Sequence, residues 1–309
     1  MREPAHVKTR LTGVGVAADN SRMTRTEGYL TALDSTRLHF ATWGEKEAAE
    51  DAPLVVLIHG FGEHLLRYEH VAQRLVSGGF VVVAVDVRGH GKSDGQRGHV
   101  LRFDEYMVDV DAAFTLADRI HPKGRRVLLG HSHGGLLATR YVLQESGQQP
   151  ELLVLSSPFL GIAVKVPGWK AALGRSLSRF KPNFSLPTEL EGSMLSTDPA
   201  VGEAYKRDAL VHGEASARWF TEVQDAQADA LRRAQHVKLP TLILQGGADK
   251  IVDVDATRRL SQGLGSEDKE YIEYDGLRHE IFNETKKETV LDDMQRWLAA
   301  HDLWVEASA

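Results

Sequence analysis

The chain has 309 residues, a hydrophobic fraction of 42%, no cysteine and a formal net charge of −6. This length and composition predict one large globular unit, and the lack of cysteine excludes a disulfide framework, thiol catalysis and a cysteine-ligated metal. The acidic balance argues against a nucleic-acid partner, which would require a basic face, and no apolar run reaches the roughly 18 residues of a membrane span.

The chain is predicted to begin with a flexible leader over residues 1–25. These residues are polar, small and basic and lack the apolar centre of a secretory signal, so we expect a cytoplasmic location. Residues 26–157 then alternate short apolar runs with helix-like segments, which predicts the first part of a folded core. The strands expected in this part are Thr26–Leu33, Arg37–Trp43, Leu54–Ile58, Phe80–Val85, Arg126–Leu129 and Leu152–Leu155.

A glycine-rich turn separates the strand at Arg126–Leu129 from the helix-like segment Leu136–Leu143. Residues 130–134 read Gly-His-Ser-His-Gly, which is a G-x-S-x-G pattern. Between a strand and a helix, this pattern is typical of a sharp turn that raises a nucleophilic serine above the sheet. We therefore predict Ser132 as a nucleophile, and the alternative is a glycine-rich helix start without chemical function.

The alternation of strands and helices stops over residues 158–225. This stretch is too long for a simple strand–helix connection, and prolines interrupt it repeatedly. We expect a helical cap inserted above the sheet edge where ligands bind in open α/β folds. Its apolar residues, including Leu160 and Leu177, are candidates for an acyl-binding wall, although part of this set is expected only to pack the cap on the core.

The second part of the core is predicted over residues 226–309, with strands at Thr241–Gln245 and Glu270–Tyr274. A serine becomes a good nucleophile only with a base and an orienting acid, which in this type of fold follow it in the order acid, then histidine. The loop after the first strand carries Asp249 and the loop after the second carries His279. We predict that Asp249 orients His279 and that His279 accepts the serine proton.

Asp253 and Asp255 are alternatives to Asp249 as the orienting acid. Both lie at the start of a predicted helix, where acidic side chains mainly complement the helix dipole. A further helix, over Lys287–His301, is expected to close the core.

The strand Leu54–Ile58 runs directly into the sequence His-Gly-Phe-Gly-Glu. Glycines at positions 60 and 62 allow the backbone to approach a reacting carbonyl group closely. We predict that the backbone N–H groups of Phe61 and His133 form an oxyanion hole. The alternative for this segment is a plain strand–helix turn. No metal site is expected. The histidines at positions 59, 131 and 133 would form one only if their side chains converged on one ion and left a fourth position open.

Together these elements predict the α/β class, with a mostly parallel central sheet, helices on both faces and a helical cap. The chain also resembles the monoacylglycerol lipase/lysophospholipase group of α/β-hydrolases, from Thr26 to Leu298. The segments that carry this resemblance are HGFGEHLLRY, DVRGHGKSDGQRGH, GHSHGG, LSSP, LPTLILQGGADKIV and YDGLRHE. The resemblance implies an α/β-hydrolase fold and a cofactor-free serine esterase with a mobile cap.

The resemblance also implies roles for individual residues. It gives the triad and the oxyanion donors as Ser132, Asp249, His279, Phe61 and His133. It places Glu63 and Arg67 near the pocket for the alcohol part of the ester. The chain departs from the family at His133, where methionine is usual, so that the side chain beside the acyl group is polar.

On this basis we expect hydrolysis of carboxylic esters of fatty acids, above all monoacylglycerols, through an acyl-enzyme on Ser132. The alternatives are a lysophospholipase, a broad-specificity short-chain carboxylesterase and a peptidase acting on small peptides. A non-catalytic ligand receptor that retains the triad is an alternative from a different class. The sequence does not predict an oligomeric state.

The cap has an uneven charge distribution. Residues 159–188 contain no acidic residue, and their basic residues are Lys165, Lys170, Arg175, Arg179 and Lys181. Apolar residues, among them Trp169, Leu173, Leu177 and Phe180, lie between them. This pattern is typical of an amphipathic helix at a lipid surface, and also of an ordinary cap helix with a solvated basic face.

Overall fold

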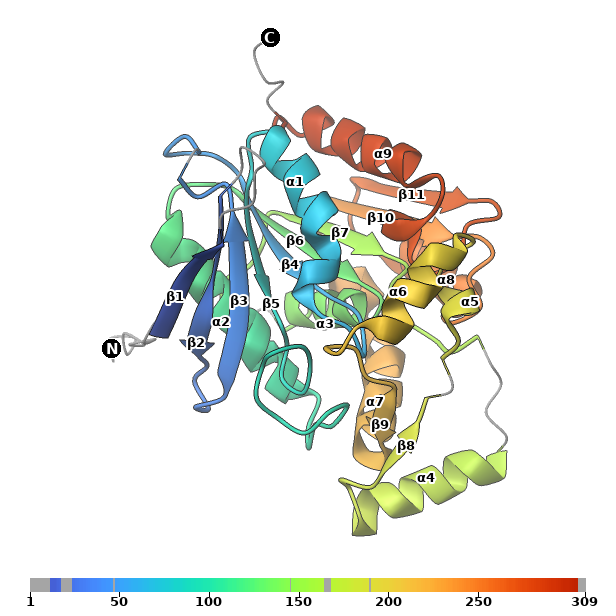
Figure 1. Ribbon diagram of the computed structural model, residues 1–309. Helices are drawn as coiled ribbons and strands as arrows, with labels where there is room; N and C mark the ends of the chain where they lie inside the picture. The colour runs from blue at the N-terminus through green and yellow to red at the C-terminus, as the bar shows by residue number, and fades with distance from the viewer. Residues whose placement is uncertain are drawn as a thin grey trace, which may run out of the picture.

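The computed structural model describes residues 12–17, 24–46, 48–144, 146–163, 168–188 and 190–304. Within them, a nine-stranded sheet forms the centre of the molecule (Figure 1). Its strands are, in spatial order, β1 (Thr12–Ala17), β2 (Arg25–Thr31), β3 (Arg37–Trp43), β5 (Val81–Val85), β4 (Leu54–Ile58), β6 (Arg126–His131), β7 (Leu152–Ser156), β10 (Thr241–Gly246) and β11 (Lys269–Tyr274).

The sheet is antiparallel at one end and parallel over the rest. Strands β1, β2 and β3 pair antiparallel in chain order, and β3 also pairs antiparallel with β5. From β5 to β11 every neighbouring pair is parallel. The parallel strands β4 and β5 read LVVLI and VVVAV, and all their residues are buried. Both faces of these strands are covered, as expected for parallel sheets, and the predicted mostly parallel sheet is confirmed.

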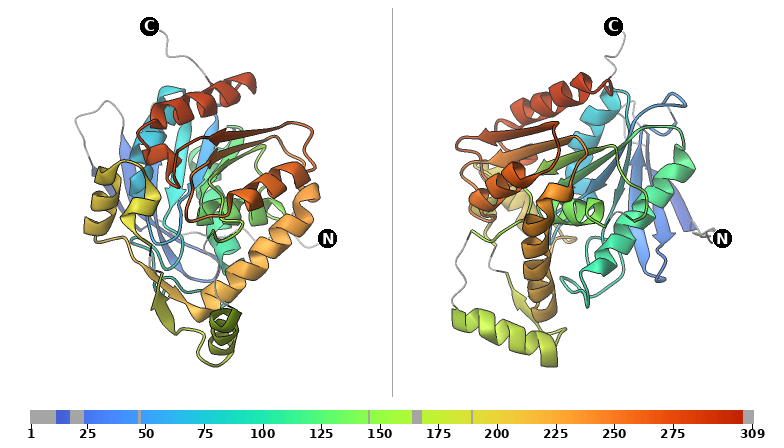
Figure 2. Two further views of the ribbon diagram at one scale, coloured as in Figure 1. Left: turned by 90° about the vertical axis from the view of Figure 1, so that its right-hand side faces the viewer. Right: turned by 180° about the vertical axis from the view of Figure 1, so that it is seen from behind.

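Helices cover both faces of the sheet, and alternate residues of β4 belong to the two buried clusters beneath them. Figure 2 shows the two layers from the side and from behind. One face carries α1 (Glu69–Ser77) and α9 (Lys287–Ala300). The other face carries α2 (Asp104–Ile120), α3 (His133–Val142) and α8 (Val254–Gly263). Short 3-10 turns are η1 (Leu65–Tyr68), η2 (Ala234–His236) and η3 (Ile281–Asn283).

The cap follows β7. Its elements are α4 (Gly168–Phe180), β8 (Ser185–Pro187), α5 (Gly192–Leu195), α6 (Pro199–Arg207), β9 (Glu214–Ser216) and α7 (Ala217–Arg233). Strands β8 and β9 pair antiparallel in a small separate sheet. Helix α4 packs on α7, and Figures 1 and 2 show it on the outer side of α7, away from the central sheet.

Two predicted boundaries differ from the structure. The cap boundary predicted at residue 225 falls inside α7, because one continuous buried face of this helix packs against the core from Trp219 to Ala230. The predicted flexible leader contains β1, which is held by backbone pairing with β2. Of the other leader residues, 1–11 and 18–23 lie outside the described residues, and Arg25 begins β2.

Candidate active site

Ser132 occupies the turn between β6 and α3. Its backbone φ is 53°, a left-handed value that non-glycine residues rarely adopt, and such strain concentrates at functional sites. A Cβ atom on Gly134 would lie 2.2 Å from the carbonyl oxygen of Ile58, and one on Gly130 would lie 2.3 Å from that of Gly134. The G-x-S-x-G pattern thus occupies a strand–turn–helix junction that only these glycines fit.

The structure brings Ser132, Asp249 and His279 together above the carboxyl ends of the parallel strands. His279 Nε2 lies 2.8 Å from Ser132 Oγ, and His279 Nδ1 lies 2.7 Å from Asp249 Oδ2. Asp249 follows β10 and His279 follows β11. This arrangement allows the imidazole to take a proton from the serine hydroxyl while the carboxylate holds the ring in place.

Burial and charge act in opposite directions on the pKa values of Asp249 and His279. Burial alone raises the pKa of Asp249, but the charge and hydrogen bond of His279 and the N–H groups of Ile251 and Val252 outweigh it and keep that pKa below its usual value. Those two N–H groups donate to Asp249 Oδ1 over 2.8 and 3.0 Å. Burial alone lowers the pKa of His279, but Asp249 outweighs burial and raises it. An ionised carboxylate therefore stabilises a charged imidazole here.

The alternative acids Asp253 and Asp255 have local structural roles. Asp253 is the N-cap of α8, and its side chain accepts the N–H of Asp255 over 3.0 Å. Asp255 forms an ion pair with Arg258 one turn further along the helix. Both residues stabilise the start of α8, as the sequence predicted.

The turn after β4 lies against the Ser132 turn. A Cβ atom on Gly60 would lie 3.2 Å from Ser132 Cβ, and the Gly60 N–H donates to Glu63 Oε1 over 2.6 Å, which holds the turn in shape. The backbone N–H groups of Phe61 and His133 have no acceptor in the part of the chain that the structure describes. The second belongs to the first residue of α3, where helix N–H groups lack intrahelical partners.

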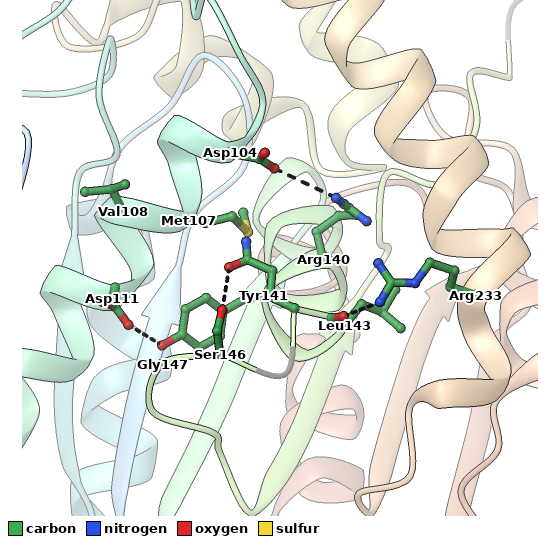
Figure 3. A pocket seen from close by; sticks show the side chains of 11 residues that line it. Asp104, Met107, Val108, Asp111, Arg140, Tyr141, Leu143, Ser146, Gly147 and Arg233 are labelled. Carbon is green, nitrogen blue, oxygen red and sulfur yellow. Dashed lines mark hydrogen bonds and ion pairs between the residues drawn. The ribbon is translucent and has the colours of Figure 1, made fainter. Parts of the chain in front are cut away.

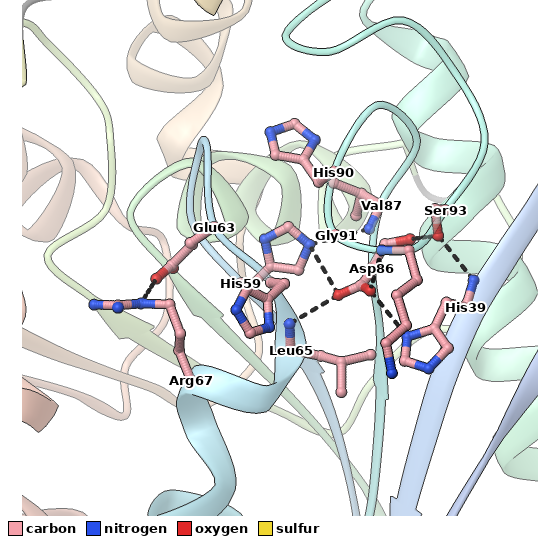
Figure 4. Close-up of polar contacts among 12 residues, drawn as sticks. His39, His59, Glu63, Leu65, Arg67, Asp86, Val87, His90, Gly91 and Ser93 are labelled. Atoms are coloured by element: carbon pink, nitrogen blue, oxygen red, sulfur yellow. Dashed lines mark hydrogen bonds and ion pairs between the residues drawn. The ribbon is translucent and has the colours of Figure 1, made fainter. Parts of the chain in front are cut away.

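A buried ionic cluster lies beside this turn, and Figure 4 shows its Glu63–Arg67 pair. Arg67 Nε donates to Glu63 Oε2 over 2.9 Å, and Arg67 Nη2 donates to the two oxygens of Glu280 over 2.7 and 2.5 Å. Tyr68 donates to Glu63 over 2.5 Å, and Asn283 donates to Glu280 over 2.9 Å. The three charged side chains are at most 9% exposed.

The sequence prediction included Glu63 and Arg67 but missed Glu280. The only sequence signal for Glu280 is its position directly after His279, because its partner Arg67 lies 213 residues away. Burial raises the pKa of Glu280 and nearby Glu63 adds to this, while Arg67 opposes it. Burial alone would also raise the pKa of Glu63, but Arg67 outweighs burial and lowers it to about 2.

Asp86, also in Figure 4, joins three segments behind the site. Its carboxylate receives the Leu65 N–H over 2.8 Å and the Lys92 N–H over 2.9 Å, and it lies 2.9 Å from His39 Nδ1 on β3. These bonds fix the start of η1, which contains Arg67, against the loop that follows β5.

The side chain of His133 is enclosed by aromatic rings. Its ring centroid lies 5.0 Å from that of Tyr106, 5.7 Å from Trp219 and 6.0 Å from Phe61. The residue has no exposed surface, and neither ring nitrogen has a hydrogen-bond partner among the described residues. Burial, with a smaller contribution from His59, lowers the pKa of His133 to about 3, so this imidazole is neutral.

The two predicted acyl-contact residues differ in position. Leu160 is buried in the core cluster, and the N–H of its neighbour Phe159 donates to the Ser132 carbonyl over 2.9 Å. Leu177 is half-buried on α4, which packs on α7. The structure therefore brings Leu160 close to the Ser132 turn but does not bring Leu177 to the triad.

A separate groove of about 450 Å³ lies between α2, the end of α3 and the end of α7 (Figure 3). Two pairs of its polar groups bind one another: Tyr141 donates to Asp111 over 2.8 Å, and Arg233 donates to the Leu143 carbonyl over 2.5 Å. No group of three or more His, Asp or Glu residues in the described ranges is placed to hold a metal ion. None of the described helices is long and apolar enough to cross a membrane.

Comparisons with known proteins agree with this architecture. Residues 49–286 match the family described as serine aminopeptidase, S33. The chain is 34% identical over 280 residues to a monoacylglycerol lipase of Mycolicibacterium smegmatis (90% of this chain, 98% of that protein). It is also 34% identical over 250 residues to the phospholipase YtpA of Bacillus subtilis (81% and 95%). The crystal structure of Paleococcus ferrophilus monoacylglycerol lipase matches with a TM-score of 0.76 and 34% identity (85% of this chain, 99% of that one). The chain therefore belongs to the serine aminopeptidase S33 family and has the α/β-hydrolase fold.

Proposed function

We propose that the protein is a serine hydrolase that cleaves fatty-acid esters, with monoacylglycerols as its substrates. The main supporting observation is the position of His279, which lies within hydrogen-bond distance of both Ser132 Oγ and Asp249 Oδ2. Relatives named as monoacylglycerol lipases, which align over most of the chain, support the substrate class.

The first half of the proposed reaction forms an acyl-enzyme. Ser132 Oγ attacks the ester carbonyl carbon while His279 Nε2 takes the hydroxyl proton, and ionised Asp249 stabilises the resulting imidazolium. The N–H groups of Phe61 and His133 donate to the oxyanion of the tetrahedral intermediate. His279 then gives its proton to the glycerol oxygen, and the C–O bond to glycerol breaks.

The second half releases the fatty acid. His279 takes a proton from a water molecule, whose oxygen attacks the acyl carbon on Ser132, and the same N–H groups hold the second oxyanion. His279 then returns the proton to Ser132 Oγ as the acyl bond breaks. Glu63 and Arg67 are assigned to the leaving alcohol, and Leu160 to the acyl chain.

The test is hydrolysis of a monoacylglycerol by Ser132→Ala together with labelling by a fluorophosphonate probe. The variant should lose several orders of magnitude in kcat and should not be labelled. Ser157→Ala is a matched control, because Ser157 is also buried with a positive φ, of 41°, at the end of a neighbouring strand. Retention of more than a few per cent of turnover by Ser132→Ala would refute the assignment.

A second candidate substrate class is lysophospholipids, which the relative named as a phospholipase favours. A series of glycerol monoesters of increasing acyl length, measured beside lysophosphatidylcholine of matched length, separates the two classes. The same series with short acyl chains tests a broad-specificity carboxylesterase.

We also propose that the outer end of the cap contacts lipid surfaces while the site takes up its substrate. Three large apolar side chains are exposed there: Phe180 (76%), Phe184 (44%) and Leu186 (56%). Exposed cations adjoin them, at Arg175, Arg179 and Lys181. Lys165 lies outside the described residues, as do the side chains of Trp169, Lys170 and Leu173.

A further inference from the structure

Two carboxylates share one guanidinium group beside Ser132. Glu63 and Glu280 both bind Arg67, at 2.9 and 2.5 Å, and all three side chains are at least nine-tenths buried. Burial raises the pKa of Glu280, but its two oxygens accept hydrogen bonds from Arg67 and one of them also accepts from Asn283, and these donors favour the ionised form. With both carboxylates ionised, two negative charges and one positive charge leave this cluster with one net negative charge. Buried charges are usually paired with opposite charges. One carboxylate is enough to neutralise Arg67, so the second carboxylate has no positive partner of its own.

The other side chains that face the cluster do not supply a compensating cation. Tyr68 and Asn283 donate hydrogen bonds to the two carboxylates and are neutral. The Tyr205 ring of α6 lies 5.2 Å from the Arg67 guanidinium carbon and is also neutral. Burial lowers the pKa of His131, on strand β6, to about 3, and burial also lowers the pKa of His59, so these two imidazoles are uncharged.

The remaining charged groups nearby are engaged elsewhere. His279 pairs with Asp249, so this second pair adds no net positive charge when the imidazole is protonated. Arg278 points to backbone carbonyl groups of the cap, at Ser193 and Ser196. The negative charge at Glu280 is therefore uncompensated within the described site.

The cluster lies beside the base that protonates the leaving alcohol. The charges of Glu280 and Glu63 both raise the pKa of His279, and His279 Nε2 delivers the proton to the departing oxygen. Glu63 Oε1 lies within 2.6 Å of the Gly60 nitrogen, in the turn that touches Ser132. An alcohol leaving from Ser132 therefore meets an excess of negative charge on the buried side chains of Glu63 and Glu280, and like charges repel more strongly between buried groups than in water.

We propose that Glu280 determines leaving-group specificity: it makes the site select esters of uncharged alcohols and reject esters whose alcohol carries a phosphate or another anion. The inference rests on the proposed function and narrows its substrate class. Among glycerol esters, it favours acylglycerols over acylglycerol phosphates.

The experiment compares three soluble esters with the same acyl chain: 1-octanoylglycerol, 1-octanoylglycerol-3-phosphate and octanoylcholine. The readout is the ratio of kcat/KM between two esters within one protein variant, because damage to folding or to the triad lowers both values and leaves their ratio unchanged. The wild type should prefer the neutral ester to the phosphorylated one. Glu280→Gln keeps the size and hydrogen-bonding capacity of the side chain, and it should lower this preference by about tenfold or more.

Two further variants control the result. Glu284→Gln is the matched control. Glu284 is a buried carboxylate in the same loop, but its partners are Thr197 and the Arg278 N–H rather than Arg67. The ratio of kcat/KM for the neutral ester to kcat/KM for the phosphorylated ester should therefore be the same in this variant as in the wild type. Asn283→Asp adds a negative charge next to Glu280 and should raise the preference for the neutral ester. The ratio of octanoylcholine to 1-octanoylglycerol should fall in Glu280→Gln and rise in Asn283→Asp.

An unchanged ratio in Glu280→Gln would overturn the proposal, as would equal wild-type kcat/KM for the neutral and phosphorylated esters. The second result needs no variant and therefore decides the question even if Glu280→Gln does not fold. Failure of the proposed function gives a different result, since none of the three esters would then be hydrolysed.

Discussion

The backbone N–H of Glu280 donates to the carbonyl oxygen of Leu195 over 2.7 Å, so the loop that carries His279 is hydrogen-bonded directly to the cap. Arg278, on the other side of the histidine, strengthens this connection by donating to the carbonyl of Ser196 over 2.9 Å and to that of Ser193. The proposed base is therefore held between two anchors on α5 and the residues that follow it. The position of the cap and the orientation of the imidazole are thus physically linked.

Arg278→Ala tests this link. Loss of its hydrogen bonds to the cap should free the loop, lower kcat several-fold and lower the unfolding temperature by a few degrees, since charged hydrogen bonds contribute about 1.5–3 kcal/mol when well buried and less when half-exposed as here. Steady-state kinetics and thermal unfolding measure both effects. Arg296→Ala is the control. It removes an exposed ion pair between Arg296 on α9 and Glu270 on β11, and it should change neither kcat nor the unfolding temperature. Identical kcat values for Arg278→Ala and the control would show that the anchors do not orient His279.

The pH dependence of kcat/KM should report the raised pKa of His279. The base must be neutral to accept the Ser132 proton, so activity should fall as pH drops through the pKa of His279, with a midpoint above the usual value of about 6.5. Asp249→Asn removes the charge that raises this pKa, and the midpoint should move to lower pH. The same variant should lose about 10³- to 10⁴-fold in kcat. A midpoint that does not move in Asp249→Asn would mean that another group controls the acid limb.

Local patterns in the sequence were sufficient to predict the core strands and the positions of the triad residues. Strands β4 and β10 lie within one residue of their predicted bounds, because a strand buried on both faces reads as an unbroken apolar run. The strand ends then bring Ser132, Asp249 and His279 to one edge of the sheet. This step needs only the chain order of the strands and their parallel direction.

Features that depend on distant contacts could not be predicted in this way. Strand β1 is rich in glycine and small residues and is an edge strand, so neither burial nor alternation marks it in the sequence. Arg67 and Glu280 are 213 residues apart in the sequence, and only the folding of the sheet brings them into contact. The end of the cap was misplaced because α7 is one amphipathic helix that belongs to both the cap and the core surface.

His133→Met should preserve catalysis and stabilise the fold. The proposed oxyanion donor is the backbone N–H, which the substitution keeps, so kcat should stay within about tenfold of the wild type. Two buried ring nitrogens at this position have no partner among the described residues, and each such group costs about 1–3 kcal/mol. Methionine fits irregular apolar space without that cost, so the unfolding temperature should rise. A thousandfold loss of kcat would instead show that the imidazole acts directly in the reaction.

The same variant should be less sensitive to acid. The pKa of His133 in the folded protein is about 3, well below the value of about 6.5 in an unfolded chain. Between these values the unfolded state binds a proton that the folded state does not, so stability falls as pH is lowered through this window, by up to about 1.4 kcal/mol per pH unit. Removing the histidine should reduce that slope by one proton. Denaturant unfolding at pH 7, 6 and 5 measures the slope, and parallel curves for the two proteins would contradict the buried, neutral state of His133.

Charge reversal at the end of α4 tests the contact of the cap with lipid. The variant Arg175→Glu/Arg179→Glu/Lys181→Glu replaces three exposed cations next to Phe180. Each cation near an anionic surface contributes about 1 kcal/mol of binding free energy. This attraction falls off over a Debye length, which becomes shorter as the salt concentration rises. Wild-type protein should therefore sediment with anionic vesicles at low salt, less at high salt, and the variant should bind weakly at both. Hydrolysis of a soluble short-chain ester should be unaffected.

The control for this experiment is a second triple variant with the same change in net charge, Arg102→Glu/Lys238→Glu/Lys286→Glu, whose residues are exposed and lie outside the cap. If the cap end is the contact surface, only the α4 variant loses vesicle binding, although both carry the same total charge. Equal losses in the two variants would mean that net charge alone drives association. Binding that does not differ between anionic and neutral vesicles would leave Phe180, Phe184 and Leu186 without a lipid partner and would restrict the cap to covering the site.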